Sequence, residues 1–179
     1  IYSSTTGWLT DAQAASAGYE NTFSKDLDNN GLISGGTYYQ LLGDNGPVTL
    51  KYKRHWSGWN DDTSVNWNVI AAKNNSSSFQ VLFDGTGSLN GKNEIWTTDE
   101  NGIYSSTTGW LTDAQAAANG YESIFQIDSD NDGIIKQKFQ TRAELDEAIN
   151  LFFFDENLAT DRFGNISDWD EIAITDFLL

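Results

Sequence analysis

The stretch that decides the fold is IYSSTTGWLTDAQAASAGYENTFSKDLDNNGLI, residues 1–33, because the chain contains it twice. Residues 103–135 read IYSSTTGWLTDAQAAANGYESIFQIDSDNDGII, and a constant offset of 102 residues aligns the two copies without a gap. The copies are identical at 24 of 33 positions. Chance does not produce such a match, so the sequence predicts a structure built from repeated units.

Each copy predicts the same order of elements. The β-branched and polar run Ile1–Gly7 predicts a short strand, and Thr10 or Asp11 offers the side chain that caps a following helix. Tyr19 and Phe23, four residues apart, belong to one stripe of that helix. An Asp-rich turn then closes the copy.

Short apolar runs separated by turn residues fill the space between the copies. Asn101-Gly102 predicts a type I′ hairpin turn, because both residues accept positive φ angles. Consecutive strands with short connections form antiparallel sheets. We therefore predict an α+β fold: an antiparallel β-meander with one packed helix per repeat unit. The predicted strands are Tyr38–Leu42, Val48–Lys53, Trp67–Ala72, Phe79–Phe83, Glu94–Thr98 and Ile103–Thr108.

Three segments follow from the repeat. Residues 1–34 are the tail of a preceding unit, with a strand, a helix and a loop, and residues 35–138 are one complete unit. Residues 139–179 are a small C-terminal segment with a helix and many turns. Thr141 caps that helix, predicted at Arg142–Phe153, and Glu144 completes a capping box.

Composition narrows the possible functions. Ten basic residues against 26 acidic residues give a net charge of −16, which disfavours nucleic acid and anionic membranes as partners and favours cations. The alternative is that the negative charge binds nothing and only keeps the protein soluble, because like-charged molecules repel one another. The chain has no cysteine, and no apolar run is long enough for a membrane helix. His55 is the only histidine and no nucleophile motif accompanies it, so we predict no enzyme, although a hydrolase with paired carboxylates remains a rival.

The two Asp-rich turns match the first half of an EF-hand-type calcium loop. Oxygen-bearing side chains stand at positions 1, 3 and 5, glycine stands at position 6, and a backbone carbonyl is expected at position 7. Affinity on the order of 10⁻⁴ to 10⁻³ M, as in extracellular modules, suits such a loop. The predicted Ca²⁺ ligands are Asp26, Asp28, Asn30 and the carbonyl of Leu32 in the first copy, and Asp128, Asp130, Asp132 and the carbonyl of Ile134 in the second.

Neither loop has the glutamate that closes an EF-hand at position 12. Thr37 stands there in the first copy and Phe139 in the second. Glu20 and Glu122, in the helix before each loop, are candidates for the missing ligand. The alternative is a pair of Asp-rich turns closed by hydrogen bonds from backbone to side chain.

Trp56, Trp59 and Trp67 gather around one predicted loop. Exposed together, they would stack on sugar rings and make a carbohydrate-binding module. The alternative is that they fill the core of the sheet, as large aromatic residues usually do.

The runs Val48–Tyr52, Trp67–Ala72, Phe79–Phe83 and Ile95–Asp99, closed by the Asp-rich turn, resemble a known family. It is the tryptophan-rich domain repeated near the C-termini of large cyanobacterial and other bacterial exported proteins. The resemblance covers about residues 35–135, with the tail of another copy at 1–34. Two departures are Lys73, where the family usually has an acidic residue, and Asn30 in place of the usual Asp.

The C-terminal segment is similar to the opening of BspA-type surface-protein repeats, through Thr141–Leu145, Ala148-Ile149, Phe163–Asp170 and Ile174–Asp176. Both resemblances imply a secreted or cell-surface module with an adhesive or scaffolding role. We expect neighbouring repeats or identical subunits as its partners. We therefore expect a calcium-stabilised repeat module. Its strand Ile1–Thr6, which lacks its own sheet, would either fold back onto this unit or add to the sheet edge of a neighbouring molecule, and the second outcome would build a filament.

Overall fold

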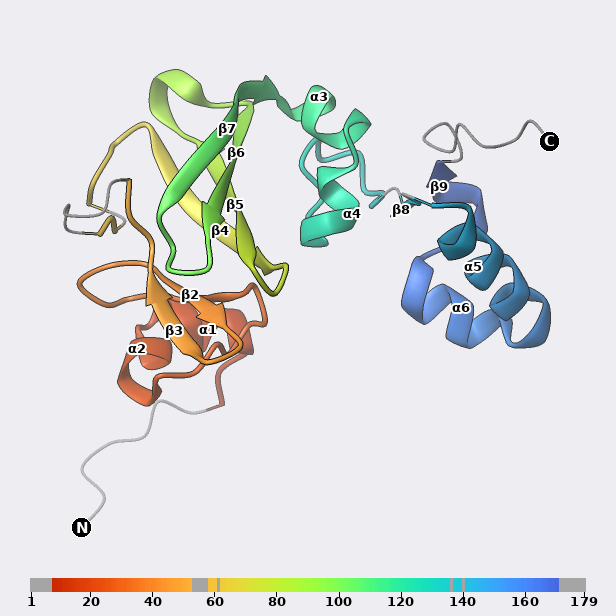
Figure 1. The fold of residues 1–179 in the computed structure, drawn as a ribbon, viewed down its shortest axis with the longest axis horizontal. Coiled ribbons are helices and arrows are strands. Elements are labelled where there is room, and N and C mark those ends of the chain that lie inside the picture. Colours follow the sequence, from red (N-terminus) through yellow and green to blue (C-terminus); the bar gives the residue numbers. More distant parts are fainter. Residues whose placement is uncertain (1–7, 53–57, 61, 136, 140, 171–179) are drawn as a thin grey trace, which may run out of the picture. The chain divides into compact units, whose positions relative to one another are not determined.

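A computed structural model describes residues 8–52, 58–60, 62–135, 137–139 and 141–170. These residues form two compact units, 1–111 and 112–179, which are described one at a time (Figure 1). The antiparallel sheets and the helices confirm the predicted α+β class. The predicted strand Ile1–Gly7 lies outside the described residues.

The first unit contains two antiparallel sheets, where a single meander was predicted. The smaller sheet has the order β1 (Leu32–Ile33), β2 (Gln40–Gly43) and β3 (Gly46–Thr49). The larger sheet has the order β4 (Trp67–Asn74), β5 (Ser78–Gly85), β6 (Lys92–Asp99) and β7 (Tyr104–Thr112). A short 3₁₀ turn, η1 (Gly87–Leu89), lies between β5 and β6.

The chain leaves the smaller sheet earlier than predicted, which is why the meander divides. Strand β3 ends at Thr49, whereas the predicted strand ran to Lys53. Lys51 instead forms a parallel bridge to Ile103: its N–H donates to the carbonyl of Gly102 at 2.9 Å, and its carbonyl accepts from the N–H of Tyr104 at 2.8 Å. This bridge joins the end of the small sheet to the start of β7.

The turn between β6 and β7 is a hairpin, but the predicted type I′ geometry is wrong. The N–H of Gly102 donates to the carbonyl of Asp99 at 3.0 Å, and only Gly102 has a positive φ, 74°. Asn101 keeps a negative φ, as in a type I turn followed by a left-handed glycine. The carboxylate of Asp99 supports this turn by accepting the N–H groups of Asn101 and Ile103, both at 2.9 Å.

The core of the first unit lies on β5 and its neighbours. Val81, Leu82 and Phe83 are all buried, so both faces of β5 are covered. This burial explains why β5 reads as a continuous apolar run and not as an alternating one. The main cluster is formed by Leu32, Tyr39, Leu41, Leu50, Val69, Ala72, Phe79, Val81, Phe83 and Trp96.

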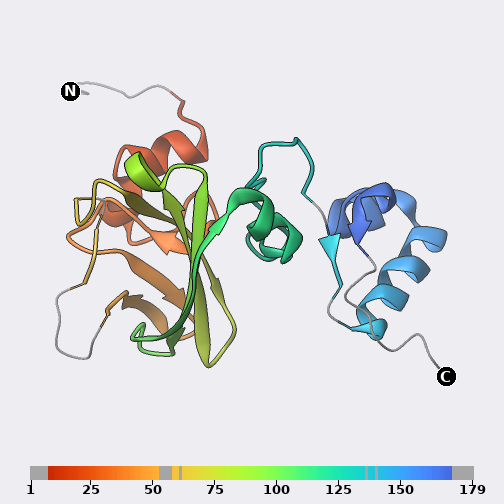
Figure 2. The same ribbon diagram turned by 90° about the horizontal axis from the view of Figure 1, so that it is seen from above.

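Each predicted repeat helix is in fact a pair of short helices. The first pair is α1 (Asp11–Ser16) and α2 (Tyr19–Phe23), and the second is α3 (Asp113–Ala118) and α4 (Tyr121–Phe125). Both pairs break at a left-handed glycine, Gly18 with φ 78° and Gly120 with φ 83°. In Figure 1 the first pair lies beside β2 and β3, and Figure 2 shows the same elements from above.

The first residues of both helix pairs are fixed by the same device. The hydroxyl oxygens of Thr10 and Thr112 each accept the backbone N–H three residues ahead at 3.2 Å. The side-chain oxygen of the glutamine at that position accepts the threonine N–H in turn at 2.9 Å. These are complete capping boxes, so of the two predicted caps, Thr10 and Asp11, it is the threonine that caps.

The second unit continues from α3 and α4 into a small helical segment. Helices α5 (Arg142–Phe154) and α6 (Glu156–Phe163) pack against each other. After η2 (Ile166–Asp168), strand β9 (Trp169–Asp170) pairs in parallel with β8 (Gln137–Lys138). The predicted capping box of Thr141 and Glu144 is confirmed. The core of this segment is Phe139, Leu145 and Ala148, with Ile149, Phe163 and Trp169 packed around it.

Among the described residues, no helix is both long enough and apolar enough to cross a membrane.

Candidate metal centre

The first acidic loop is shaped by its own side chains. Asp26 accepts the N–H of Asn29 on Oδ1 at 2.6 Å and the N–H of Gly31 on Oδ2 at 2.9 Å. Asp28 accepts from Asn30 at 3.3 Å, and the amide oxygen of Asn30 accepts from Leu32 at 2.8 Å. The backbone is left-handed at Asn29 and Gly31, with φ 63° and 82°. The loop therefore turns Asp26, Asp28 and Asn30 inward.

Glu20, on α2, is fully buried beneath this loop. Its Oε1 accepts the N–H of Leu27 at 2.9 Å, and its Oε2 accepts the N–H and the hydroxyl of Ser34 at 3.0 and 2.7 Å. Burial raises the pKa of Glu20, but the donors from Ser34 and Leu27 outweigh it and leave the pKa below its ordinary value. Glu20 is thus held ionised inside the protein.

Three acidic side chains converge at the first loop. One oxygen from each of Glu20, Asp26 and Asp28 lies within 4.8 Å of the others. Burial and then the charge of Glu20, with a smaller contribution from Asp26, raise the pKa of Asp28. The cluster concentrates negative charge that a cation would neutralise.

The second loop repeats this geometry. Asp128 accepts the N–H of Gly133 at 2.9 Å, Asp130 accepts from Asp132 at 3.2 Å, and Asp132 accepts from Ile134 at 2.9 Å. Asn131 and Gly133 have φ 57° and 84°, close to their counterparts in the first copy. Oxygens of Glu122, Asp128 and Asp130 again lie within 4.8 Å of one another.

The second cluster differs from the first in one respect that bears on metal binding. Glu122 is 1 % exposed and accepts the N–H of Ser129 on Oε1 at 2.8 Å. Its Oε2, together with Oδ1 of Asp128 and Oγ of Ser129, is buried without a hydrogen-bond partner among the described residues. In the first copy Ser34 satisfies the matching glutamate oxygen, whereas the second copy has Lys136 there, which lies outside the described residues.

Buried carboxylate oxygens without a donor are costly, and a protein usually satisfies them with water or a cation. The donor set here is made of carboxylate oxygens, with no histidine or cysteine. Such ligands suit a hard cation, and an irregular loop that supplies several of them at once suits Ca²⁺ better than the strictly octahedral Mg²⁺.

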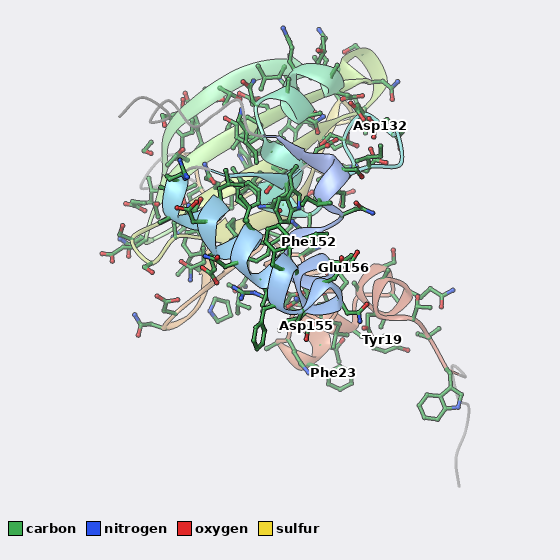
Figure 3. All side chains as sticks on the ribbon, turned by 90° about the vertical axis from the view of Figure 1, so that its right-hand side faces the viewer. Tyr19, Phe23, Asp132, Phe152, Asp155 and Glu156 are labelled. Atoms are coloured by element: carbon green, nitrogen blue, oxygen red, sulfur yellow. The ribbon has the colours of Figure 1, made fainter. Side chains whose placement is uncertain are left out.

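The structure therefore brings six of the predicted ligands into two triplets, one from each copy. Asn30 and Asp132 stand at position 5 of the loops, and each accepts the N–H two residues ahead. Figure 3 marks Asp132 on the second loop. Leu32 is buried in β1, whereas the side chain of Ile134 is 37 % exposed. At position 12, Phe139 is buried in the core of the C-terminal segment, and the glutamate in each cluster comes from the preceding helix instead.

Two of the three predicted ligand-binding tryptophans lie in an aromatic cluster of the first unit, and Trp56 lies outside the described residues, as does His55. Trp59 contacts Trp67 and Trp96, with ring centroids 4.9 and 4.6 Å apart. All three border a hollow of about 190 Å³, with Trp110 as a fourth tryptophan wall and Ser64, Asn66 and Glu94 as polar neighbours. Trp96 and Trp110 were not among the predicted residues, because sheet pairing and not sequence proximity brings them there.

These features define a class of protein: an α+β repeat module in which a tryptophan-rich antiparallel sheet is followed by a helix pair and an acidic loop. Residues 31–136 match the model of the tryptophan-rich Synechocystis species C-terminal domain. This match spans more than half of the chain, so the chain belongs to that family. No curated protein and no solved structure showed a significant match. The similarity of residues 139–179 to BspA-type repeats stays a prediction.

Proposed function

We propose that this chain is a calcium-stabilised structural module of a secreted or cell-surface protein. The observation that carries the proposal is the buried, unpartnered Oε2 of Glu122, which shares its surroundings with the unpartnered Oδ1 of Asp128. A cation bound by the cluster would satisfy oxygens that the described part of the protein leaves without donors. The repeated Asp-x-Asp-x-Asn/Asp-Gly pattern adds a second, independent argument.

The metal's role would be structural. Glu122 lies on α4, and Asp128 and Asp130 lie on the loop that leaves it. An ion held by all three would tie the loop to the helix and fix the direction in which the chain continues. Metal binding of this kind contributes directly to folding stability. Stabilisation by a bound metal would take the place of disulfide bonds, which this chain cannot form because it has no cysteine.

The two sites are expected to differ. At the first, the donors from Ser34 and Leu27 already satisfy both oxygens of Glu20. At the second, the corresponding glutamate keeps one oxygen without a donor from the described part of the chain. We therefore expect the second loop to depend more strongly on calcium than the first.

Thermal unfolding of the calcium-stripped protein tests the proposal. At calcium about ten times the dissociation constant, one site adds about 1.4 kcal/mol. For a chain of this size the midpoint should rise by roughly 3–6 °C. Asp130→Asn should reduce the rise, and magnesium at the same concentration should give a smaller one. A midpoint indifferent to calcium and chelator would contradict the proposal.

The wider setting is also part of the proposal. An acidic, cysteine-free repeat module suits an adhesive or scaffolding role at the cell surface, where millimolar-range calcium affinity is useful. The similarity of the C-terminal segment to BspA-type surface repeats supports the same setting. The proposal assigns no catalytic residue.

The tryptophan-lined hollow favours a second candidate function, binding of a saccharide. Its walls are Trp59, Trp67, Trp96 and Trp110, and Glu94 supplies a carboxylate at its edge. The volume of about 190 Å³ is below the ~300–1,000 Å³ of drug-sized sites, so it would take a single sugar ring. A glycan array with Trp110→Ala tests this idea, with Trp8→Ala as the control, since Trp8 is fully exposed and outside the hollow. An array without hits, or equal binding by both variants, would remove it.

A further inference from the structure

The first acidic loop is docked on the sheets of its own unit. The N–H of Ala72 in β4 donates to the carbonyl of Asn30 at 2.8 Å, and the N–H of Leu42 donates to the carbonyl of Gly31 at 3.0 Å. A Cβ on Gly31 would collide with the carbonyl of Ala72, so the backbones meet at a contact that only glycine permits. Immediately after the loop, Leu32 pairs with Leu41 and is 2 % exposed.

The second acidic loop has the same backbone, but within the described ranges no sheet packs against it in this way. A Cβ on Gly133 would meet nothing within 4 Å. Ile134, the counterpart of Leu32, is 37 % exposed, and Ile134 and Ile135 belong to no strand. The φ angles at Asn131 and Gly133 stay within 6° of those at Asn29 and Gly31. The second loop thus keeps the shape that docks in the first copy, but its Ile134 stays partly exposed where Leu32 is buried.

The start of the chain shows the opposite deficiency. Trp110 packs against the core of the large sheet, but its counterpart Trp8 is fully exposed. Among the described residues, Trp8 therefore lacks the sheet on which Trp110 packs, and Ile134 and Ile135 lack the strand pairing that Leu32 and Ile33 make in β1. Trp8 and the second acidic loop thus each lack, within the described residues, the neighbour that their counterparts have.

We propose that the second acidic loop, Asp128–Ile135, docks on the seat formed by β2 and β4 of a second copy of this chain, as the first loop docks on its own. The proposal rests on the internal repeat and not on calcium binding. Gly133 of one molecule would lie against the Ala72 carbonyl of the other molecule, and Ile134 would pair with Leu41 of that other molecule. Such a contact joins different surfaces head to tail, so it builds open chains of molecules and not closed dimers by symmetry.

In each chain the first loop already occupies the surface formed by β2 and β4. Because it belongs to the same chain, its effective concentration there is in the millimolar range, which gives it an advantage over the loop of another molecule. The second loop of another molecule therefore docks only where the seat is vacant. This exchange is a form of domain swapping, in which one element is replaced by an equivalent one.

The test removes the first loop from the surface formed by β2 and β4. Gly31→Ala places a Cβ against the Ala72 carbonyl and also disfavours the left-handed backbone there, so it should expel the first loop. Sedimentation equilibrium over about a hundredfold range of concentration should then show an average mass that rises to at least about twice that of the monomer. Wild type should remain a monomer under the same conditions.

A second substitution shows which surface makes the contact. Gly31→Ala combined with Ile134→Asp should remain monomeric, because the charge prevents Ile134 from entering an apolar position. Gly31→Ala combined with Ile166→Asp is the matched control: Ile166 is similarly exposed, at 43 %, but lies outside the loop, so association should persist. A monomeric Gly31→Ala protein would overturn the proposal. So would identical behaviour of the two double variants, whether both associate, both stay monomeric or both fail to fold.

Discussion

Glu122 and Asp128 bring carboxylate oxygens within 4.8 Å of each other, and each has one buried oxygen that accepts no hydrogen bond from the described residues. The equivalent pair in the first copy, Glu20 and Asp26, has no such orphan oxygen among the described residues. Two nearly identical stretches of sequence therefore build clusters of the same shape. The clusters differ in how many of their carboxylate oxygens accept a hydrogen bond from the described residues.

Glu122→Gln tests the role of the orphan oxygen. The amide keeps the size of the side chain but removes one charge from the cluster, so calcium at the second site should bind at least about tenfold more weakly. Without calcium the variant should be no less stable than wild type, because repulsion among the three acids is relieved. Melting curves with and without calcium measure both effects.

The matched control for that variant is Glu20→Gln in the first copy. It replaces one of two accepting oxygens with an NH₂ group, so either Leu27 or Ser34 loses its acceptor at a fully buried side chain, which should destabilise the protein even without calcium. If both variants lose the same stability and keep the full calcium response, the assignment of Glu122 as a ligand is wrong.

Ser34→Ala should make the first cluster behave like the second. The Ser34 hydroxyl donates to Oε2 of Glu20 at 2.7 Å, and its loss from a buried ionised group should cost about 1.5–3 kcal/mol in the absence of calcium. Calcium should then restore part of the loss, giving a larger shift in melting temperature than in wild type. Ser77→Ala, an exposed serine beyond β4, should change stability by less than about 0.5 kcal/mol. An unchanged calcium shift in Ser34→Ala would argue against a cation at the first loop.

Phe83→Ala should unfold the first unit more readily than any surface change. Phe83 is 1 % exposed and contacts Trp59, Trp67 and Trp96, so truncation leaves a cavity and should cost about 3–5 kcal/mol. Urea unfolding followed by tryptophan fluorescence reports it, since the rings around the cavity are the probes. Phe154→Ala, 90 % exposed in the second unit, is the control and should leave the midpoint unchanged. Similar costs for both would mean that the aromatic cluster is not the core.

Thr141→Ala should weaken the start of α5. The hydroxyl of Thr141 accepts the N–H of Glu144 at 3.2 Å, and loss of a threonine cap typically costs about 1 kcal/mol. Hydrogen exchange in α5 should accelerate accordingly. Thr160→Ala, on an exposed position of α6, provides the comparison and should cause no such acceleration. Equal exchange rates in the two variants would contradict the capping role.

Much of the architecture could be predicted because the signals are local. Asp-x-Asp-x-Asn/Asp-Gly repeats one tight loop in both copies, and Thr141 with Glu144 is a capping box that the sequence states directly. Glu20 and Glu122 could be proposed as ligands because they precede each loop by the same distance. Five of the six predicted strands overlap strands of the structure closely, since their apolar runs are short and bounded by turn residues.

The remaining features depend on tertiary contacts or on backbone states that the pattern does not encode. Gly18 and Gly120 adopt left-handed angles and divide each predicted helix. Phe23, predicted on the same stripe as Tyr19, stacks on it but is 67 % exposed (Figure 3). The link between the two sheets is the bridge between Lys51 and Ile103, residues 52 positions apart. At the first cluster, Ser34 donates to Oε2 of Glu20 from outside the Asp-rich motif, a contact with the preceding helix that the pattern does not encode.

The most direct test of the central claim is calorimetric titration of calcium into the metal-stripped protein, alongside the Asp128→Asn/Asp130→Asn variant. We expect saturable calcium binding with a dissociation constant on the order of 10⁻⁴ to 10⁻³ M, and weaker or no binding at the second site in the variant. Absence of binding heat in the wild-type protein at millimolar calcium, or an identical isotherm in the variant, would contradict it.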